Sequence, residues 1–378
     1  MHRLRGLGRR QLVLAGAAAV LLVVLVGWLL LRPGATPPPG PSASPTASPE
    51  PTPSPSPSPV PSPSAEPGVA CPLNGLLVDD PTLLDRTALA VQIENHPLAR
   101  PARNLSNADM VIEVPVEGDT TRFTAIILCR ATDGLTGPVR SARYYMIDLW
   151  QDLGVLPVGF GASNGALTRF ADAGMPYVNG ITGAWPWFKR SGTNPVPHNL
   201  YADVEAIRDA LGSGGAIDRL AADVGPLRPP FAFDPSVTLP AGRSVAAVEI
   251  RTNRYWRFGW SWDAAASLWA RQDAGKPVVD EINGEQLTVT HVLVQRVTQE
   301  VVYGDPDPGG NPRRLQHLVG EGDGTLYSGG VAIALHWSRP TAEDGTSWTY
   351  ADSGEPVVLP PGVVWWEVVP TTAGVTES

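Results

Sequence analysis

The sequence has little cysteine, histidine and lysine. Its 378 residues include two cysteines and six histidines, and Lys189 and Lys276 are its only lysines. Cys71 and Cys129 do not have the spacing of a structural metal site. We therefore predict no metal and no cofactor.

Basic residues are also scarce: the chain has 28 against 37 acidic ones, a net charge of −9. Residues 1–32 hold five arginines and no acid, so the remainder has 23 basic and 37 acidic residues. This balance argues against a nucleic-acid surface, which needs an excess of positive charge. An anion site in such a chain requires a local cluster of arginines.

Charge is absent from residues 12–31, a run of twenty mostly apolar residues. A helix of this length matches the hydrocarbon core of a bilayer. Four arginines and no acid precede the run, which predicts a cytoplasmic tail at 1–11 and an exterior C-terminus. A cleaved signal peptide is the alternative, but the run is longer than its usual apolar region and no A-x-A-like site follows. We predict a single-pass transmembrane anchor in the cell membrane.

Proline, serine and threonine dominate residues 32–68. This composition has nothing to bury and favours extended polyproline II structure, which predicts a disordered spacer. Cys71 follows the spacer and Cys129 ends an apolar run. Because disulfides persist outside the cell, we predict a Cys71–Cys129 bridge, with two free thiols as the alternative.

Two exterior domains are expected, at 69–231 and 232–370, followed by a tail at 371–378. In the first, short apolar runs alternate with helical patterns, which predicts an α/β domain with a mixed sheet. The expected strands are 88–93, 110–114, 123–128 and 155–160, and the expected helices are 141–153, 165–173, 202–211 and 217–223. The second domain lacks helix signals and is expected to be mostly antiparallel β, so the predicted class is α+β.

Eight of the twelve tryptophans fall in the second expected domain. Exposed tryptophans stack on sugars or hold a partner. In a small β domain, however, tryptophan more often fills the core, and we predict that role here.

Polar residues gather in four stretches of the first domain. Ligands of α/β sheets bind where strands end, so these residues are candidates for one site. The candidate ligand-binding residues are Glu94, Asn95, Glu113, Glu117, Arg122, Arg140, Arg143, His198 and Asn199.

Arg140 and Arg143 carry the sharpest of these signals. The stretch "GPVRSARYYMIDLW" predicts a helix with Ser141 as its N-cap, so both arginines are expected at or inside the first turn. Backbone N–H groups already make that end positive, and arginine is unfavourable there. Either internal carboxylates (Glu94, Glu113 or Glu117) or a bound anion would compensate. We predict an anion held by Arg122, Arg140, Arg143 and His198.

Five motifs in order, "IENHPLARP", "NADMVIEV", "EGDTTRF", "GPVRSAR" and "PHNLY", resemble the YerB-like family of bacterial envelope lipoproteins. The resemblance implies an α/β domain joined to a β-rich domain, outside the cytoplasm. It implies no activity, because the family has no established one. The chain departs from the lipoprotein pattern by its transmembrane anchor, expected in place of a lipidated cysteine.

Three functions compete. In the first, the protein binds an anionic envelope component through the arginine cluster. In the second, it is a non-catalytic scaffold or regulator that binds an envelope protein. In the third, it is a hydrolase with Ser163 of "GASNG" as nucleophile. The only histidine that follows Ser163 in the same expected domain is His198, which is early for a triad; a helix cap at Ser163 or Asn164 is the competing interpretation. No catalytic residue is assigned, and whether the protein is an enzyme stays open.

Overall fold

The computed structural model describes residues 68–378, apart from 133, 184, 212–213 and 215–216. The expected tail at 1–11, the anchor at 12–31 and the spacer up to residue 67 lie outside the described residues. Within the described ranges, no helix has both the length and the apolar character needed to cross a membrane.

Strands dominate the fold, and the helices are short. In the first half the elements are η1 (Pro81–Asp85), β1 (Leu89–Glu94), η2 (Pro97–Ala99), β2 (Met110–Pro115), β3 (Thr121–Ile127), β4 (Leu135–Thr136), α2 (Met146–Leu153), β5 (Leu156–Gly159), α3 (Asn164–Asp172), β6 (Val178–Asn179), η3 (Trp185–Trp187), β7 (Phe188–Arg190), β8 (Leu200–Asp203), α4 (Val204–Leu211) and α5 (Asp218–Ala222). In the second half they are β9 (Ala232–Phe233), β10 (Arg243–Ser244), β11 (Ala247–Arg251), β12 (Arg257–Asp263), β13 (Leu268–Asp273), β14 (Lys276–Pro277), β15 (Thr288–Val289), β16 (His291–Val297), β17 (Gln299–Val302), β18 (Arg313–Gln316), β19 (Gly320–Ser328), β20 (Val331–Arg339), β21 (Ser347–Tyr350), β22 (Val358–Leu359), β23 (Val364–Pro370) and β24 (Gly374–Glu377).

One large mixed sheet organises residues 68–378. Its strand order is β10-β20-β19-β16-β23-β2-β3-β1-β5-β6, with β21 paired to β20. Strand β23 lies between β16 and β2 and is parallel to both, so the sheet is continuous across the expected boundary at 231/232. The β-rich α+β class is confirmed in outline, while the division into two domains stays a prediction.

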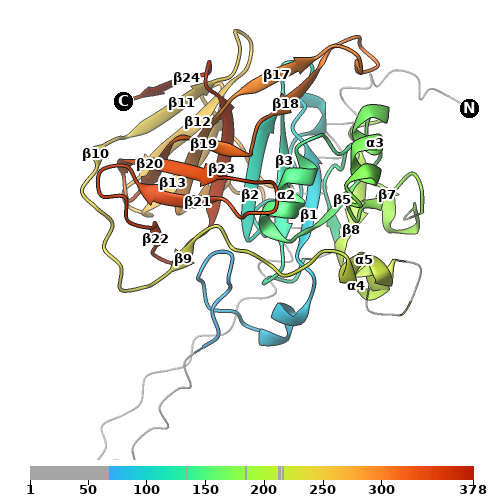
Figure 1. Ribbon diagram of the computed structural model, residues 1–378, viewed down its shortest axis with the longest axis horizontal. Coiled ribbons are helices and arrows are strands. Elements are labelled where there is room, and N and C mark those ends of the chain that lie inside the picture. The colour runs from blue at the N-terminus through green and yellow to red at the C-terminus, as the bar shows by residue number, and fades with distance from the viewer. Residues whose placement is uncertain (1–67, 133, 184, 212–213, 215–216) are drawn as a thin grey trace, which may run out of the picture. The chain divides into compact units, whose positions relative to one another are not determined.

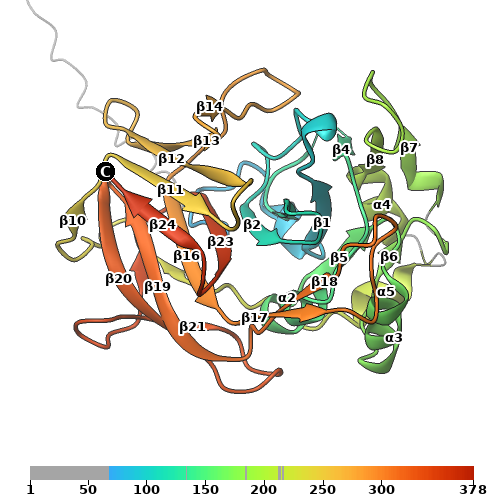
Figure 2. The same ribbon diagram turned by 90° about the horizontal axis from the view of Figure 1, so that it is seen from above.

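The main sheet is covered on both faces, which explains why β1, β2 and β3 are buried along their whole length. Helices α2 and α3 cover one face, and a second sheet, ordered β14-β13-β12-β11-β24 with β15 beside β13, covers the other (Figures 1 and 2). Side chains alternate along a strand, so neighbouring residues enter opposite cores. Trp365 meets Trp260 at 5.1 Å between ring centroids, and Trp366 meets Trp348 at 5.7 Å.

The tryptophans of the second half therefore fill the two cores, as predicted. Trp260, Trp269, Trp337, Trp348, Trp365 and Trp366 are buried, and Trp256 and Trp262 are partly buried against the same cores. A stacking surface built on them is not present among the described residues.

The predicted disulfide is confirmed. Cys71 and Cys129 are bridged, with their Cα atoms 5.8 Å apart. The bond ties the start of the described chain to the end of β3. The carboxylate of Asp109 lies beside both sulfurs and accepts hydrogen bonds from the backbone N–H groups of Leu128 and Cys129, so this cluster is a structural crosslink.

The helix expected at 141–153 begins later, at Met146. Ser141 is not its N-cap, and Arg140 and Arg143 do not lie in its first turn. The reason is that residues 139–142 are extended and bonded to other strands: Val139 N–H donates to the carbonyl of Leu200, and Ala142 N–H to that of Gly161. The expectation of a helix dipole acting on these arginines was wrong.

Candidate functional site

Seven of the nine predicted ligand residues line one cavity of about 530 Å³. They reach it from distant parts of the chain. The seven are Glu94, Asn95, Glu117, Arg122, Arg140, Arg143 and His198, and other lining residues include His96, Ser163, Asp307 and Arg313. Four arginines thus face three carboxylates, although the chain as a whole carries a net charge of −9.

Sheet register places the first of these residues. Strands β1 and β3 are antiparallel, and Glu94 at the end of β1 pairs with Arg122 near the start of β3. The extended segment at 139–142 runs beside the end of β1, since Arg140 N–H donates to the carbonyl of Gln92. The cavity therefore lies at the end of β1, where the chain leaves the sheet.

Two of the arginines are compensated internally. Arg143 Nε donates to Glu117 Oε2 at 2.8 Å, and its Nη2 donates to Oε1 of the same carboxylate. Arg313, from β18, also donates to Glu117 Oε1. Burial tends to raise the pKa of Glu117, but the charges of Arg143 and Arg122 outweigh it and bring that pKa to about 2. Glu117 is thus a buried anion between two guanidinium groups.

Glu94 joins Arg140 and His198. Its Oε1 lies 3.1 Å from Arg140 Nε, and its Oε2 lies 3.0 Å from His198 Nδ1. The imidazole therefore donates from Nδ1 to the carboxylate, which leaves Nε2 as the free ring nitrogen. Within the described part of the chain, His198 Nε2 makes no hydrogen bond. The ring of His96 stacks on that of His198 with centroids 4.7 Å apart.

Arg122 is the arginine that internal pairing leaves unsatisfied. It is 5% exposed, and no carboxylate oxygen among the described residues lies within salt-bridge distance of it. One terminal nitrogen donates to the carbonyl of Ser141, but the buried Nε has no partner. Burial, and then the like charge of Arg143, lower the pKa of Arg122 to about 9, although the more distant charges of Glu117 and Glu94 act in the opposite direction. The surroundings therefore disfavour its charge, and a negative group in the cavity would relieve this.

Comparison with known proteins places the chain in a family. Residues 73–216 match the profile of the "Protein of unknown function (DUF3048) N-terminal domain", and residues 246–366 match that of the corresponding C-terminal domain. The chain is 29% identical over 301 residues to "Putative lipoprotein YerB" of Bacillus subtilis (strain 168), covering 79% of this chain and 86% of the relative. A crystal structure of YerB from Bacillus subtilis superposes with a TM-score of 0.66 at 26% identity, covering 82% of this chain and 99% of the other. The chain belongs to the YerB-like family.

Two predicted ligand residues of this YerB-like chain lie outside the cavity. Glu113 is fully buried between the sheets, where Arg271 Nη2 donates to both of its oxygens at 2.9 and 2.7 Å. Its neighbour on β23 is Glu367, whose pKa is raised well above the ordinary value by burial and then by the charge of Glu113. Asn199 accepts a hydrogen bond from Arg190 outside the cavity. Neither Glu113 nor Asn199 therefore lines the cavity.

Ser163 lines the cavity as a helix cap. It is the N-cap of α3, and its Oγ accepts a hydrogen bond from Ala166 N–H at 3.2 Å. The hydroxyl also donates to Asp305, which accepts from Tyr144 as well. In the described chain no hydrogen bond joins Ser163 to His198. Among the described residues, Ser163 therefore lacks the histidine base of a Ser–His triad.

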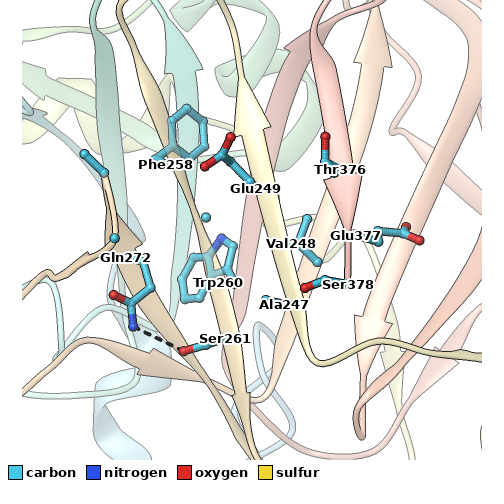
Figure 3. Close-up of a pocket in the computed structure, with 13 residues that line it drawn as sticks. Ala247, Val248, Glu249, Phe258, Trp260, Ser261, Gln272, Thr376, Glu377 and Ser378 are labelled. Atoms are coloured by element: carbon cyan, nitrogen blue, oxygen red, sulfur yellow. Dashed lines mark hydrogen bonds between the residues drawn. The ribbon is translucent and has the colours of Figure 1, made fainter.

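A second hollow lies on the outer face of the sheet formed by β11, β12, β13 and β24 (Figure 3). Several of its polar groups already have partners: Gln272 donates to Ser261, and Glu377 pairs with Arg243. Its volume is about 390 Å³, and none of the described residues that line it is an arginine, lysine or histidine, so the arginine-lined cavity is the better candidate for an anion site.

Arg313 is a cavity residue that the sequence did not reveal. It lies more than a hundred residues beyond His198, at the start of β18, and the β17–β18 hairpin carries it over the cavity. No motif near it signals binding. His96, by contrast, is next to Glu94 and Asn95, and the polar run at the end of a predicted strand was a signal for it.

Proposed function

We propose that this protein binds a small oxyanion, of phosphate or carboxylate type, in the cavity lined by Arg122, Arg140 and Arg143. The single observation that carries the proposal is Arg122, a buried guanidinium in a cavity wall whose Nε makes no hydrogen bond and which, among the described residues, has no carboxylate within salt-bridge distance. Guanidinium groups bind such oxyanions through paired N–H donors. An anion would supply the missing partner.

We further propose that the site acts outside the cell membrane, on an anionic component of the envelope. Support comes from the relative described as a lipoprotein and from the apolar run at 12–31 followed by a proline-rich spacer. In the polyproline II conformation expected from its composition, at about 3.1 Å per residue, the 37-residue spacer would reach up to roughly 100 Å from the membrane. In the scaffold alternative an envelope protein is the partner, and the arginine-lined cavity is not part of that proposal.

Thermal unfolding of the full chain tests the site. Melts with inorganic phosphate, malonate or chloride at equal ionic strength separate phosphate, carboxylate and mere salt effects. Because a ligand that binds only the folded state stabilises it, phosphate or malonate should raise the melting temperature beyond chloride. Arg122→Gln should abolish this rise without a large loss of stability in chloride, because it removes an unpaired buried charge.

Arg208→Gln is the matched control. Arg208 is also buried, and its Nε likewise makes no hydrogen bond, although Glu205 Oε1 lies 3.9 Å from it. Its terminal nitrogens donate to the backbone carbonyls of Thr87 and Ile127, and it lies outside the cavity. The Arg208 variant should keep the anion-dependent rise even if it is less stable. The proposal is wrong if the wild-type protein shows no such rise, or if Arg122→Gln retains it.

A further inference from the structure

Beside the arginines, the cavity contains an imidazole oriented by a carboxylate. Glu94 holds His198 through Nδ1 at 3.0 Å, and His198 Nε2 makes no hydrogen bond with any described residue. In the neutral ring this arrangement fixes the proton on Nδ1 and leaves a lone pair on Nε2. A histidine held in this way is suited to accept a proton.

The imidazole and the anion-binding groups converge on one place. The two oxygens of Glu94 bind Arg140 and His198 respectively, so the guanidinium and the imidazole flank the same carboxylate. Arg122 is the cross-strand partner of Glu94, and all four residues line the cavity. A group bound by Arg122 and Arg140 would therefore lie beside His198.

The chemistry of that group follows from this convergence. In a ligand held by its carboxylate, the charged group is not the atom that a hydrolytic reaction would attack. In a phosphate diester, the phosphorus atom that reacts also bears the charged oxygens, and its transition state gains charge on them. One set of arginines can then both bind the substrate and stabilise the transition state.

We infer that His198 is a catalytic general base and that the cavity hydrolyses a phosphate diester, with Glu94 as the positioning residue. The inference rests on the proposed anion site. His198 Nε2 takes a proton from a water molecule of the solvent as the water oxygen forms a bond to phosphorus. The bond from phosphorus to the leaving oxygen breaks, and the leaving alkoxide takes a proton from solvent. His198 then releases its proton to solvent, which restores the neutral ring.

The fold also favours water over Ser163 as the nucleophile. Ser163 Oγ is occupied by Asp305 and by the N–H of Ala166, and it has no hydrogen bond to His198. A water molecule beside His198 Nε2 can instead give its proton directly to that base. The proposed reaction therefore forms no covalent enzyme intermediate.

The test uses the full chain and bis(p-nitrophenyl) phosphate, with release of p-nitrophenolate as the readout and p-nitrophenyl acetate as a carboxylic ester for comparison. The wild-type protein should hydrolyse the phosphate diester in preference to the acetate. His198→Gln should lower kcat about 100-fold or more, the usual contribution of a general base. Its binding of inorganic phosphate, measured by calorimetry, should be unchanged.

His317→Gln is the matched control, because His317 also lies beside a carboxylate, Glu300, at 3.5 Å but outside the cavity. It should retain full activity. Glu94→Gln should lower kcat more than it changes KM, since a misoriented imidazole impairs proton transfer more than binding.

The outcomes separate the two proposals. Phosphate binding without hydrolysis by the wild-type protein would overturn this inference and leave the anion site intact. Absence of phosphate binding would overturn both. Equal activity of His198→Gln and wild type would remove His198 as the base.

Discussion

Arg143 and Glu117 form a two-point ion pair in the wall of the cavity, with Nε donating to Oε2 at 2.8 Å and Nη2 donating to Oε1. Both side chains are largely buried. The carboxylate that compensates Arg143 is thus supplied by the chain itself. The ion pair between Arg140 and Glu94 is more exposed to solvent, because a third of the Arg140 side chain is accessible. Glu94 also binds His198.

Arg143→Ala should therefore destabilise the fold by about 3–5 kcal/mol, the usual cost of removing one partner of a buried ion pair. Arg140→Ala should cost only about 0–1 kcal/mol, as for a partly exposed pair. Urea unfolding at neutral pH in a buffer without phosphate measures both. If both variants lost equally little stability, the ion pair between Arg143 and Glu117 would not stabilise the fold as predicted.

Acid should weaken the fold through Glu117. The folded-state pKa of Glu117 is about 2, below the ordinary 4.5, so its ionised form stabilises the fold. This contribution, about 3 kcal/mol by linkage, is complete above pH 4.5 and is lost as the pH falls from 4.5 towards 2. Denaturant unfolding across this range should show a shallower acid loss in Glu117→Gln than in wild type. The exposed Glu300→Gln serves as control and should follow the wild-type curve.

The disulfide should contribute about 4 kcal/mol, because it closes a loop with a sequence separation of 58 residues and so restricts the unfolded chain. Cys71→Ser with Cys129→Ser should lower the free energy of unfolding by about this amount. The same double variant should leave phosphate binding intact, since neither cysteine lines the arginine cavity. A double variant as stable as the wild type would contradict the prediction.

Gly259→Ala should destabilise the second sheet. A Cβ at this position would lie 2.0 Å from the carbonyl oxygen of Val248 on the paired strand, and a backbone atom cannot move aside cheaply. We expect a loss of about 1–3 kcal/mol, as for other overpacked sites. Gly304→Ala, where nothing lies within 4 Å of the added carbon, is the control. Similar melting temperatures for the two variants would argue against a close approach at Gly259.

Strand positions could be predicted closely because buried β segments are short, apolar and bounded by turn residues. Strand β2, for example, was expected at 110–114 and spans Met110–Pro115. The expected helix at 141–153 failed at its start, because the backbone at 139–142 bonds to other segments. Local helix propensity does not reveal competing hydrogen-bond partners such as Gly161 and Leu200, which lie 19 residues from Ala142 (161 − 142) and 61 residues from Val139 (200 − 139).

The sequence alone predicted the disulfide and the importance of the polar residues that follow β1. Both predictions depend on residue type and on where the apolar runs end. The tertiary structure decided which charges neutralise one another. It paired Arg143 with Glu117 and brought Arg313 from the second half of the chain to the same carboxylate. It also buried Glu113 away from the cavity and left the Nε of Arg122 without a hydrogen bond. Ion pairing depends on separations of a few ångströms between atoms far apart in the chain, and only the packed sheet fixes those distances.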